Sequence, residues 1–283
     1  MQKVKITADS TCDLSAELCA RYDISLSPLT VIMGGNAYLD GVDITPPDIF
    51  DFVSKNGSLP KTSAVPAALY EEFFAEQLKT SESIVHVSLS SKISSTYNNA
   101  VFAAKTFRGR VFVVDSLSLC AGQGLLAIKA SILAKNNRPP EEIVDTLDYY
   151  KQHLNTSFVP DSLDYLHKGG RCNLASMISA TLLKLHPFID MQDGPMYAKK
   201  KYMGNMEVCI KKYVADLAEF YPDYDKSLCV IANAYAPKEL VDKLREQIKE
   251  TFDFEEILET TAGCTITSHC GKNTVAVFFF TEK

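Results

Sequence analysis

Short apolar runs alternate with helix-like segments along the chain, and this alternation restricts the fold more than any other feature of the sequence. Two of the runs, 84–89 and 111–115, are nearly continuous and rich in valine, as strands buried on both faces of a parallel sheet are. Residues 98–107, which lie between them, are predicted to form a helix. We therefore predict an α/β fold in which helices cover a mostly parallel sheet.

The chain is long enough for two domains, since its 283 residues exceed the usual size of one. A short strand predicted at 156–159 begins a second series of strands and helices, so we place a boundary there. We expect an N-terminal α/β domain over 1–155 and a second α/β domain over 156–283. The helices expected in the second half are 174–185, 208–220 and 237–251, and the strands are 187–191, 228–232, 257–260 and 274–280.

Charge and composition exclude several classes of protein. The formal net charge of −6 argues against nucleic-acid binding, which usually needs a basic surface. No apolar run approaches the roughly 20 residues that span a membrane, and the first residues lack the apolar stretch of a signal peptide. We therefore expect a cytoplasmic protein. Its eight cysteines show no Cys-x-x-Cys pair and no zinc-ligand spacing, so free thiols are expected.

A loop with five hydroxyl groups in seven residues follows the predicted strand 84–89. It runs from Ser90 to Thr96, at the carboxyl end of a strand, where open α/β sheets bind ligands. The next helix begins there, and its free N–H groups and dipole favour an anion. The loop predicts an oxyanion site for a carboxylate or a phosphate. Serines that only fill turn and cap positions would give the same pattern.

Motifs for nucleotide use or nucleophilic catalysis are missing. The chain has no Gly-x-x-x-x-Gly-Lys-Ser/Thr loop and no Gly-x-Gly-x-x-Gly fingerprint. Neither Gly-x-Ser-x-Gly nor Ser-x-x-Lys accompanies the serines of the loop. Carboxylate clusters typical of metal sites are also missing. The residues alone therefore favour a binding protein that uses no metal or nucleotide cofactor.

Other polar residues have an ordinary structural interpretation beside a functional one. Thr62 and Ser63 precede a helix predicted over 67–78, where such residues usually act as caps. Asp13 is similarly predicted to cap a helix over 14–22. His269 falls in a predicted loop before the last strand, where a single histidine is more often structural than functional.

Two basic segments also have both an ordinary and a functional interpretation. Arg171 follows two glycines, and its guanidinium either offers donors to a phosphate or carboxylate or lies on the surface without a role. The run Lys199–Lys201 is more typical of a solvated face than of a phosphate site.

Seven short segments, taken in order, match the pattern of one known family. Asp9-Ser10-Thr11-Cys12-Asp13 is similar to an opening Asp-Ser-Thr-x-Asp, and Leu89 to Tyr97 is similar to Ser-Ser-x-Leu-Ser-Gly-Thr-Tyr. The other segments are Tyr38 to Ile44, Thr62-Ser63, Val114-Asp115-Ser116, Gly122 to Leu125, and Leu163 to Arg171. Together they resemble the DegV family, whose members include the fatty-acid-binding (FakB-like) subunits of bacterial fatty acid kinase.

The resemblance implies a two-domain DegV-like fold that binds a long-chain fatty acid and is not itself an enzyme. It implies that the carboxylate is held by the hydroxyls of Thr62 and Ser94, with Ser63, Ser95 and His269 beside them. A separate kinase subunit would phosphorylate this carboxylate with ATP to an acyl phosphate for phospholipid metabolism, and Arg171 would serve the kinase or the phosphoryl transfer. Peripheral membrane contact for lipid exchange is compatible with this role.

Three departures from the family pattern keep alternatives open. Met203 stands where the family often has an arginine that serves the kinase, which also fits a lipid sensor or store without a kinase partner. Ser95 replaces a glycine of the loop, and His269-Cys270-Gly271 is all that remains of a His-x-Gly-Pro-Gly segment. A serine hydrolase that uses a loop serine with His269 is a third, less favoured alternative.

Overall fold

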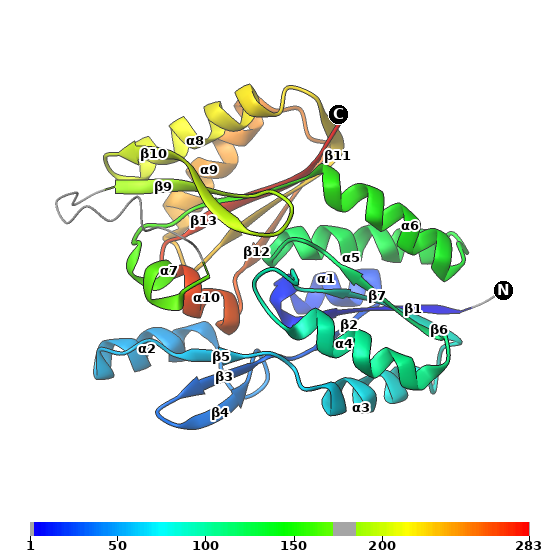
Figure 1. The fold of residues 1–283 in the computed structure, drawn as a ribbon. Coiled ribbons are helices and arrows are strands. Elements are labelled where there is room, and N and C mark those ends of the chain that lie inside the picture. The colour runs from blue at the N-terminus through cyan, green and yellow to red at the C-terminus, as the bar shows by residue number, and fades with distance from the viewer. Residues whose placement is uncertain (1–2, 172–184, 283) are drawn as a thin grey trace.

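The protein is described by a computed structural model over residues 3–171 and 185–282 (Figure 1). The helix expected over 174–185 lies outside these residues, except for Leu185, which begins a strand. The strands of the described residues form three sheets. The mixed α/β class predicted from the alternating runs is confirmed.

The first sheet is parallel throughout, with the order β2-β1-β6-β7. Its strands β6 and β7 are the runs predicted as buried, and every residue of β6 is buried. Helices cover both faces of this sheet, with α3 and α4 packed together on one side and α5 and α6 on the other (Figure 1). The elements of this part are β1 (Val4–Asp9), η1 (Ser10–Cys12), α1 (Ala16–Tyr22), β2 (Ile24–Ser27), α3 (Ala67–Gln77), β6 (Ser83–Ser88), α4 (Thr96–Ala104), η2 (Lys105–Phe107), β7 (Val111–Asp115), α5 (Cys120–Lys135), α6 (Pro140–Tyr150) and η3 (Lys151–His153).

The second sheet has the order β10-β9-β8-β13-β11-β12, and of its neighbouring pairs only β11 and β12 are parallel. Helices α8 and α9 cover its outer face (Figure 1). The boundary proposed between residues 155 and 156 falls inside β8. The elements are β8 (Leu154–Val159), α7 (Asp164–Gly169), β9 (Leu185–Met191), β10 (Met196–Met203), α8 (Met206–Phe220), β11 (Tyr224–Asn233), α9 (Lys238–Thr251), β12 (Glu256–Thr261), α10 (Cys264–Cys270) and β13 (Val275–Thr281).

Helix α5 lies between the two larger sheets and contacts strands of both. Its sequence is apolar or small on nearly every side, and most of its residues are buried. A helix that is apolar all round needs partners on all sides, so two sheets can pack on it at once. The side chains at the start of α5 therefore lie where the two halves of the chain meet.

A third, small sheet has the order β4-β3-β5 and carries one of the predicted site residues. Gly34 and Gly35 adopt positive φ in the turn between β3 and β4, as a tight hairpin turn requires. Thr62 and Ser63 lie in β5, paired with β3, and Pro66 precedes α3 instead. Their predicted role as helix caps is therefore wrong. The elements are β3 (Thr30–Met33), β4 (Asn36–Leu39), α2 (Pro46–Asn56) and β5 (Lys61–Ser63).

Helix α10 connects the C-terminal half to this small sheet. It packs against α2, α7, β3 and β5. The carboxylate of Asp40 accepts hydrogen bonds from the amides of Cys264 (2.7 Å) and Thr265 (3.2 Å), and Asp13 accepts one from Gly263 (2.9 Å). Asp13 thus holds the start of α10, whereas Ser15 caps α1, contrary to expectation. Two carboxylates from the N-terminal half position the helix that carries His269.

Candidate functional site

A buried aspartate anchors the root of the serine-rich loop. Asp9, at the end of β1, is fully buried and accepts hydrogen bonds from the Ser88 hydroxyl and the Leu89 amide, each at 2.8 Å. Tyr70 and His86 also bond its carboxylate. These hydrogen bonds to the buried Asp9 carboxylate are all formed only when the end of β6 has one geometry. The cluster therefore fixes the direction in which the chain leaves β6.

The hydroxyls of the loop differ in what they contact. Ser90 donates to the carbonyl of Gly194 in the β9–β10 turn at 3.2 Å. Ser94 is partly buried, shares a 2.7 Å hydrogen bond with the Thr96 hydroxyl and accepts one from the Thr96 amide. Ser95 is exposed, immediately precedes α4 and makes no side-chain capping bond. The loop therefore directs Ser94, and not Ser95, towards the interior.

Thr62 and His269 meet although 207 positions separate them in the chain. Thr62 Oγ1 lies 2.8 Å from His269 Nε2. His269 is in the last turn of α10, so the loop expected around it is wrong. The other ring nitrogen, Nδ1, is buried and has no hydrogen-bond partner in the described part of the chain. It lies against Gly169, where an added Cβ would come within 2.7 Å of it.

The surroundings of His269 keep its ring neutral at pH 7. Burial, and to a smaller extent the positive charge of Arg171, lower the pKa of His269 to about 4. Leaving a buried N–H group without an acceptor costs more free energy than leaving a ring lone pair without a donor. Nδ1, which has no partner among the described residues, therefore carries the lone pair, and the proton belongs on Nε2. His269 then donates to Thr62, and the hydroxyl hydrogen of Thr62 is free for another acceptor.

These residues line one cavity, which we call the head-group cavity. It brings together Thr62, Ser63, Ser94, Arg171 and His269, which are all but one of the residues predicted from the sequence. Ser95 is not among its lining residues. The other lining side chains are mostly aliphatic: Leu29, Ala64, Leu89, Ile93, Leu119, Met196, Thr265 and Ile266.

Among the residues that the structure describes, Arg171 is the only charged one that lines this cavity. It is exposed, and its guanidinium donates to the carbonyl of Gly169 at 2.8 Å. It therefore lies where solvent meets the cavity and attracts an anion to it.

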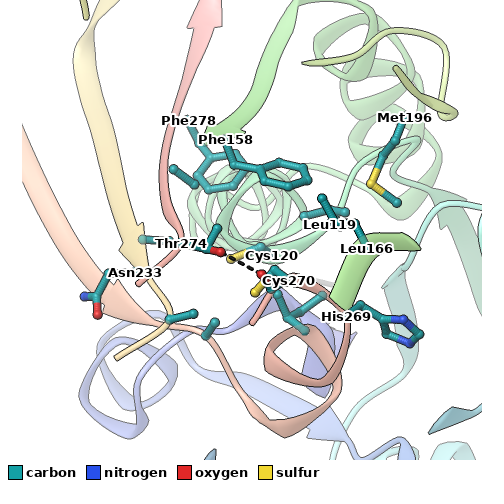
Figure 2. Close-up of a pocket in the computed structure, with 15 residues that line it drawn as sticks. Leu119, Cys120, Phe158, Leu166, Met196, Asn233, His269, Cys270, Thr274 and Phe278 are labelled. Carbon is teal, nitrogen blue, oxygen red and sulfur yellow. Dashed lines mark hydrogen bonds between the residues drawn. The ribbon is translucent and has the colours of Figure 1, made fainter. Parts of the chain in front are cut away.

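A second, almost wholly apolar cavity, which we call the tail pocket, adjoins the first (Figure 2). Figure 2 shows His269 and Met196 at one end and Asn233 at the other, with Phe158 and Phe278 along one side. The two cavities share four residues, namely Leu119, Met196, Ile266 and His269. The site therefore joins a polar end to an apolar interior, which suits a ligand with one polar group and a long hydrocarbon part.

Most tail-pocket residues could not have been singled out in the sequence. Ala232 and Ala276 are small residues on central strands, and Phe158 and Phe278 have the pattern of ordinary core residues. Thr265 was also missed, although its position four residues before His269 would place both on one face of a helix. That clue was unusable because no helix was predicted there.

Two lysines of the run Lys199–Lys201 have a structural explanation. Lys199 pairs with the buried Asp190 at 2.7 Å, and Lys200 pairs with Asp216 at 2.8 Å, so these lysines are engaged by carboxylates.

Within residues 3–171 and 185–282, no group of three or more potential ligands could hold a metal ion. No helix of that part of the chain is long and apolar enough to cross a membrane.

Comparisons with known proteins agree on one family. The protein-family sequence model described as "Uncharacterised protein, DegV family" matches residues 3–282 of this chain. A DegV domain-containing protein of Clostridium acetobutylicum is 30% identical over 280 residues, 99% of each chain. A DegV family protein from Thermus thermophilus, whose structure is described by its fatty acid binding, superposes with a TM-score of 0.92 at 25% identity over 100% of each chain. A Thermotoga maritima protein, described as revealing a fatty acid binding function, gives 0.85 at 27% identity, again over 100% of each chain.

Proposed function

The chain belongs to the DegV family, and on that premise we propose that it binds a long-chain fatty acid across the two cavities. One observation carries this proposal: the head-group cavity, which is lined by hydroxyl groups, and the apolar tail pocket share four lining residues. Similar proteins described as fatty-acid-binding support it. The carboxylate would lie in the head-group cavity and the acyl chain in the tail pocket.

The polar residues suit an ionised carboxylate. Thr62 has a free hydroxyl hydrogen if His269 donates to it, and Ser94 lies in the same cavity. Hydrogen bonds to a charged acceptor each contribute about 1.5–3 kcal/mol. Arg171 adds a positive charge at the mouth, and Ser63 lines the cavity as well. Hydroxyl donors thus replace the water that a buried carboxylate loses.

The tail pocket supplies the larger share of the binding free energy. Each methylene group taken out of water contributes about 0.8 kcal/mol, so an acyl chain of many carbons far outweighs one hydrogen bond. The four residues shared between the cavities would lie around the first carbons of the chain. We expect the protein to be cytoplasmic and to need no cofactor for binding.

The finer part of the proposal is that the bound acid is presented to a separate kinase subunit. Phosphorylation of the carboxylate would give an acyl phosphate. We expect Arg171, which is exposed and lines the head-group cavity, to contact the incoming phosphoryl group or the kinase. Arg171→Ala should keep the acid affinity within about fivefold, since an exposed ion pair contributes at most about 1 kcal/mol. Kinase-dependent turnover of the bound acid should fall much further.

Native mass spectrometry of the purified protein, followed by solvent extraction, tests the binding proposal directly. We expect a bound fatty acid, and delipidated protein should take it up again. Thr62→Val and Ser94→Ala should each weaken binding by about 1–3 kcal/mol. Ser91→Ala, from the same loop but outside the cavity lining, is the matched control. No lipid in the extract and no uptake by the delipidated protein would refute the proposal.

One observation favours a second candidate, a lipid sensor or store without a kinase. Met203, where the family often has an arginine, ends β10 with 60% of its surface exposed and offers no charge to a partner. This function predicts tight acid binding without turnover by any fatty acid kinase subunit supplied with ATP.

The hydrolase alternative is less favoured still, because His269 pairs with Thr62 and not with a serine. Labelling by a fluorophosphonate probe, lost in Ser94→Ala, would support it.

A further inference from the structure

Thr265 has a buried hydroxyl that no group among the described residues satisfies. The residue is 3% exposed, and its Oγ1 has no hydrogen-bond partner within residues 3–171 and 185–282. Buried polar groups are nearly always hydrogen-bonded, because losing water without a replacement costs free energy. An unsatisfied hydroxyl beside a cavity therefore indicates a missing partner.

The neighbouring hydroxyls show that this is specific to Thr265. In the same helix, Thr267 donates to the carbonyl of Ala262 at 3.2 Å, and Ser268 donates to the carbonyl of Cys264 at 2.7 Å. Both are as deeply buried as Thr265. Thr265 is thus the one hydroxyl of α10 that is not bonded to a backbone carbonyl.

Thr265 lines the head-group cavity together with Thr62, Ser94 and His269. It lies one helical turn before His269, so both side chains are on the same face of α10. Its backbone is held in place because its amide donates to Asp40 at 3.2 Å. A residue with a fixed backbone and an unengaged hydroxyl is prepared to bind a ligand without breaking an existing bond.

We infer that Thr265 is a further ligand for the carboxylate of the bound fatty acid, an inference that rests on the proposed function. A carboxylate has two oxygens and accepts several hydrogen bonds. Before any ligand arrives, Thr62 accepts a hydrogen bond from His269 and keeps its hydroxyl hydrogen free, whereas Ser94 shares a hydrogen bond with Thr96. Thr265 brings a donor that has no competing partner. It therefore binds the carboxylate together with Thr62 and Ser94, which line the same cavity.

Binding by delipidated Thr265→Val tests this inference, because valine keeps the shape of threonine and loses only the hydroxyl. Dissociation constants are measured for palmitic acid and for hexadecanol, which has the same chain and no carboxylate. The affinity for the acid should fall about tenfold, and the affinity for the alcohol should change by less than about threefold. Thr265→Ser should restore acid binding, and Thr267→Val, which removes a hydroxyl outside the cavity, should leave it unchanged.

Unchanged acid affinity in Thr265→Val would overturn the inference, and so would an equal loss for the acid and the alcohol, which would indicate a packing role. Thr265→Ser keeps the test valid if the valine variant folds poorly, since failure of the serine variant to retain acid binding would also contradict the inference. A wild-type protein that binds neither compound would refute the proposed function itself, which is a different outcome.

Discussion

Replacing His269 with glutamine should remove part of the protein's sensitivity to acid. Burial lowers the pKa of His269 to about 4 in the folded protein, against 6.5 for an ordinary histidine in the unfolded chain. The unfolded state therefore binds the proton more tightly. The stability associated with the neutral ring is fully present above pH 6.5 and is lost as the pH falls towards 4.

The size of the effect follows from these two pKa values. According to the linkage relation, titration of His269 lowers the free energy of unfolding by about 0.2 kcal/mol at pH 7 and by about 2 kcal/mol at pH 5, relative to a residue that does not titrate. The free energy of unfolding of the wild type should therefore fall by about 2 kcal/mol more than that of His269→Gln between these two pH values. Glutamine suits the comparison because its side-chain amide can still donate to Thr62.

Urea denaturation of the delipidated proteins at pH 7, 6 and 5 measures this difference. Other groups titrate over the same range, so the quantity of interest is the change in the gap between wild type and variant. His167→Gln, which replaces an exposed histidine, serves as the control for the substitution itself. Parallel loss of stability in wild type and His269→Gln would show that the ring is not buried in its neutral form, and the reasoning would fail.

Three further substitutions test other parts of the structure. In Gly169→Ala, the new Cβ would come within 2.7 Å of His269 Nδ1, so the ring must move. Acid affinity measured by calorimetry should therefore fall at least about fivefold, and unchanged affinity would contradict this. Asp40→Asn weakens the hold on the start of α10 and should lower the free energy of unfolding by about 1–3 kcal/mol in urea, more than Asp43→Asn on the surface does. Ala232→Leu fills part of the tail pocket and should shift the preferred acid to a shorter chain, each lost methylene weakening binding by about 0.8 kcal/mol; an unaltered chain-length preference would place the tail elsewhere.

The sequence alone identified the framework of this protein. The runs 84–89 and 111–115 became neighbouring parallel strands because continuous apolar stretches are stable only when buried on both faces. Ser94 was also predicted correctly to lie in a loop at the end of a strand. These features depend on local composition and periodicity, which are readable along the chain.

Tertiary structure decided how the head-group residues come together. Thr62 had the local pattern of a helix cap and His269 that of a loop residue, yet one lies in a strand and the other in a helix. The strand exists because β3 offers it an edge, and α10 is held by Asp13 and Asp40 from the distant N-terminal half. The tail pocket was equally hidden, since its residues are those of any hydrophobic core. Whether such residues enclose a pocket depends on the space that distant elements leave between them, and no local pattern in the sequence records that space.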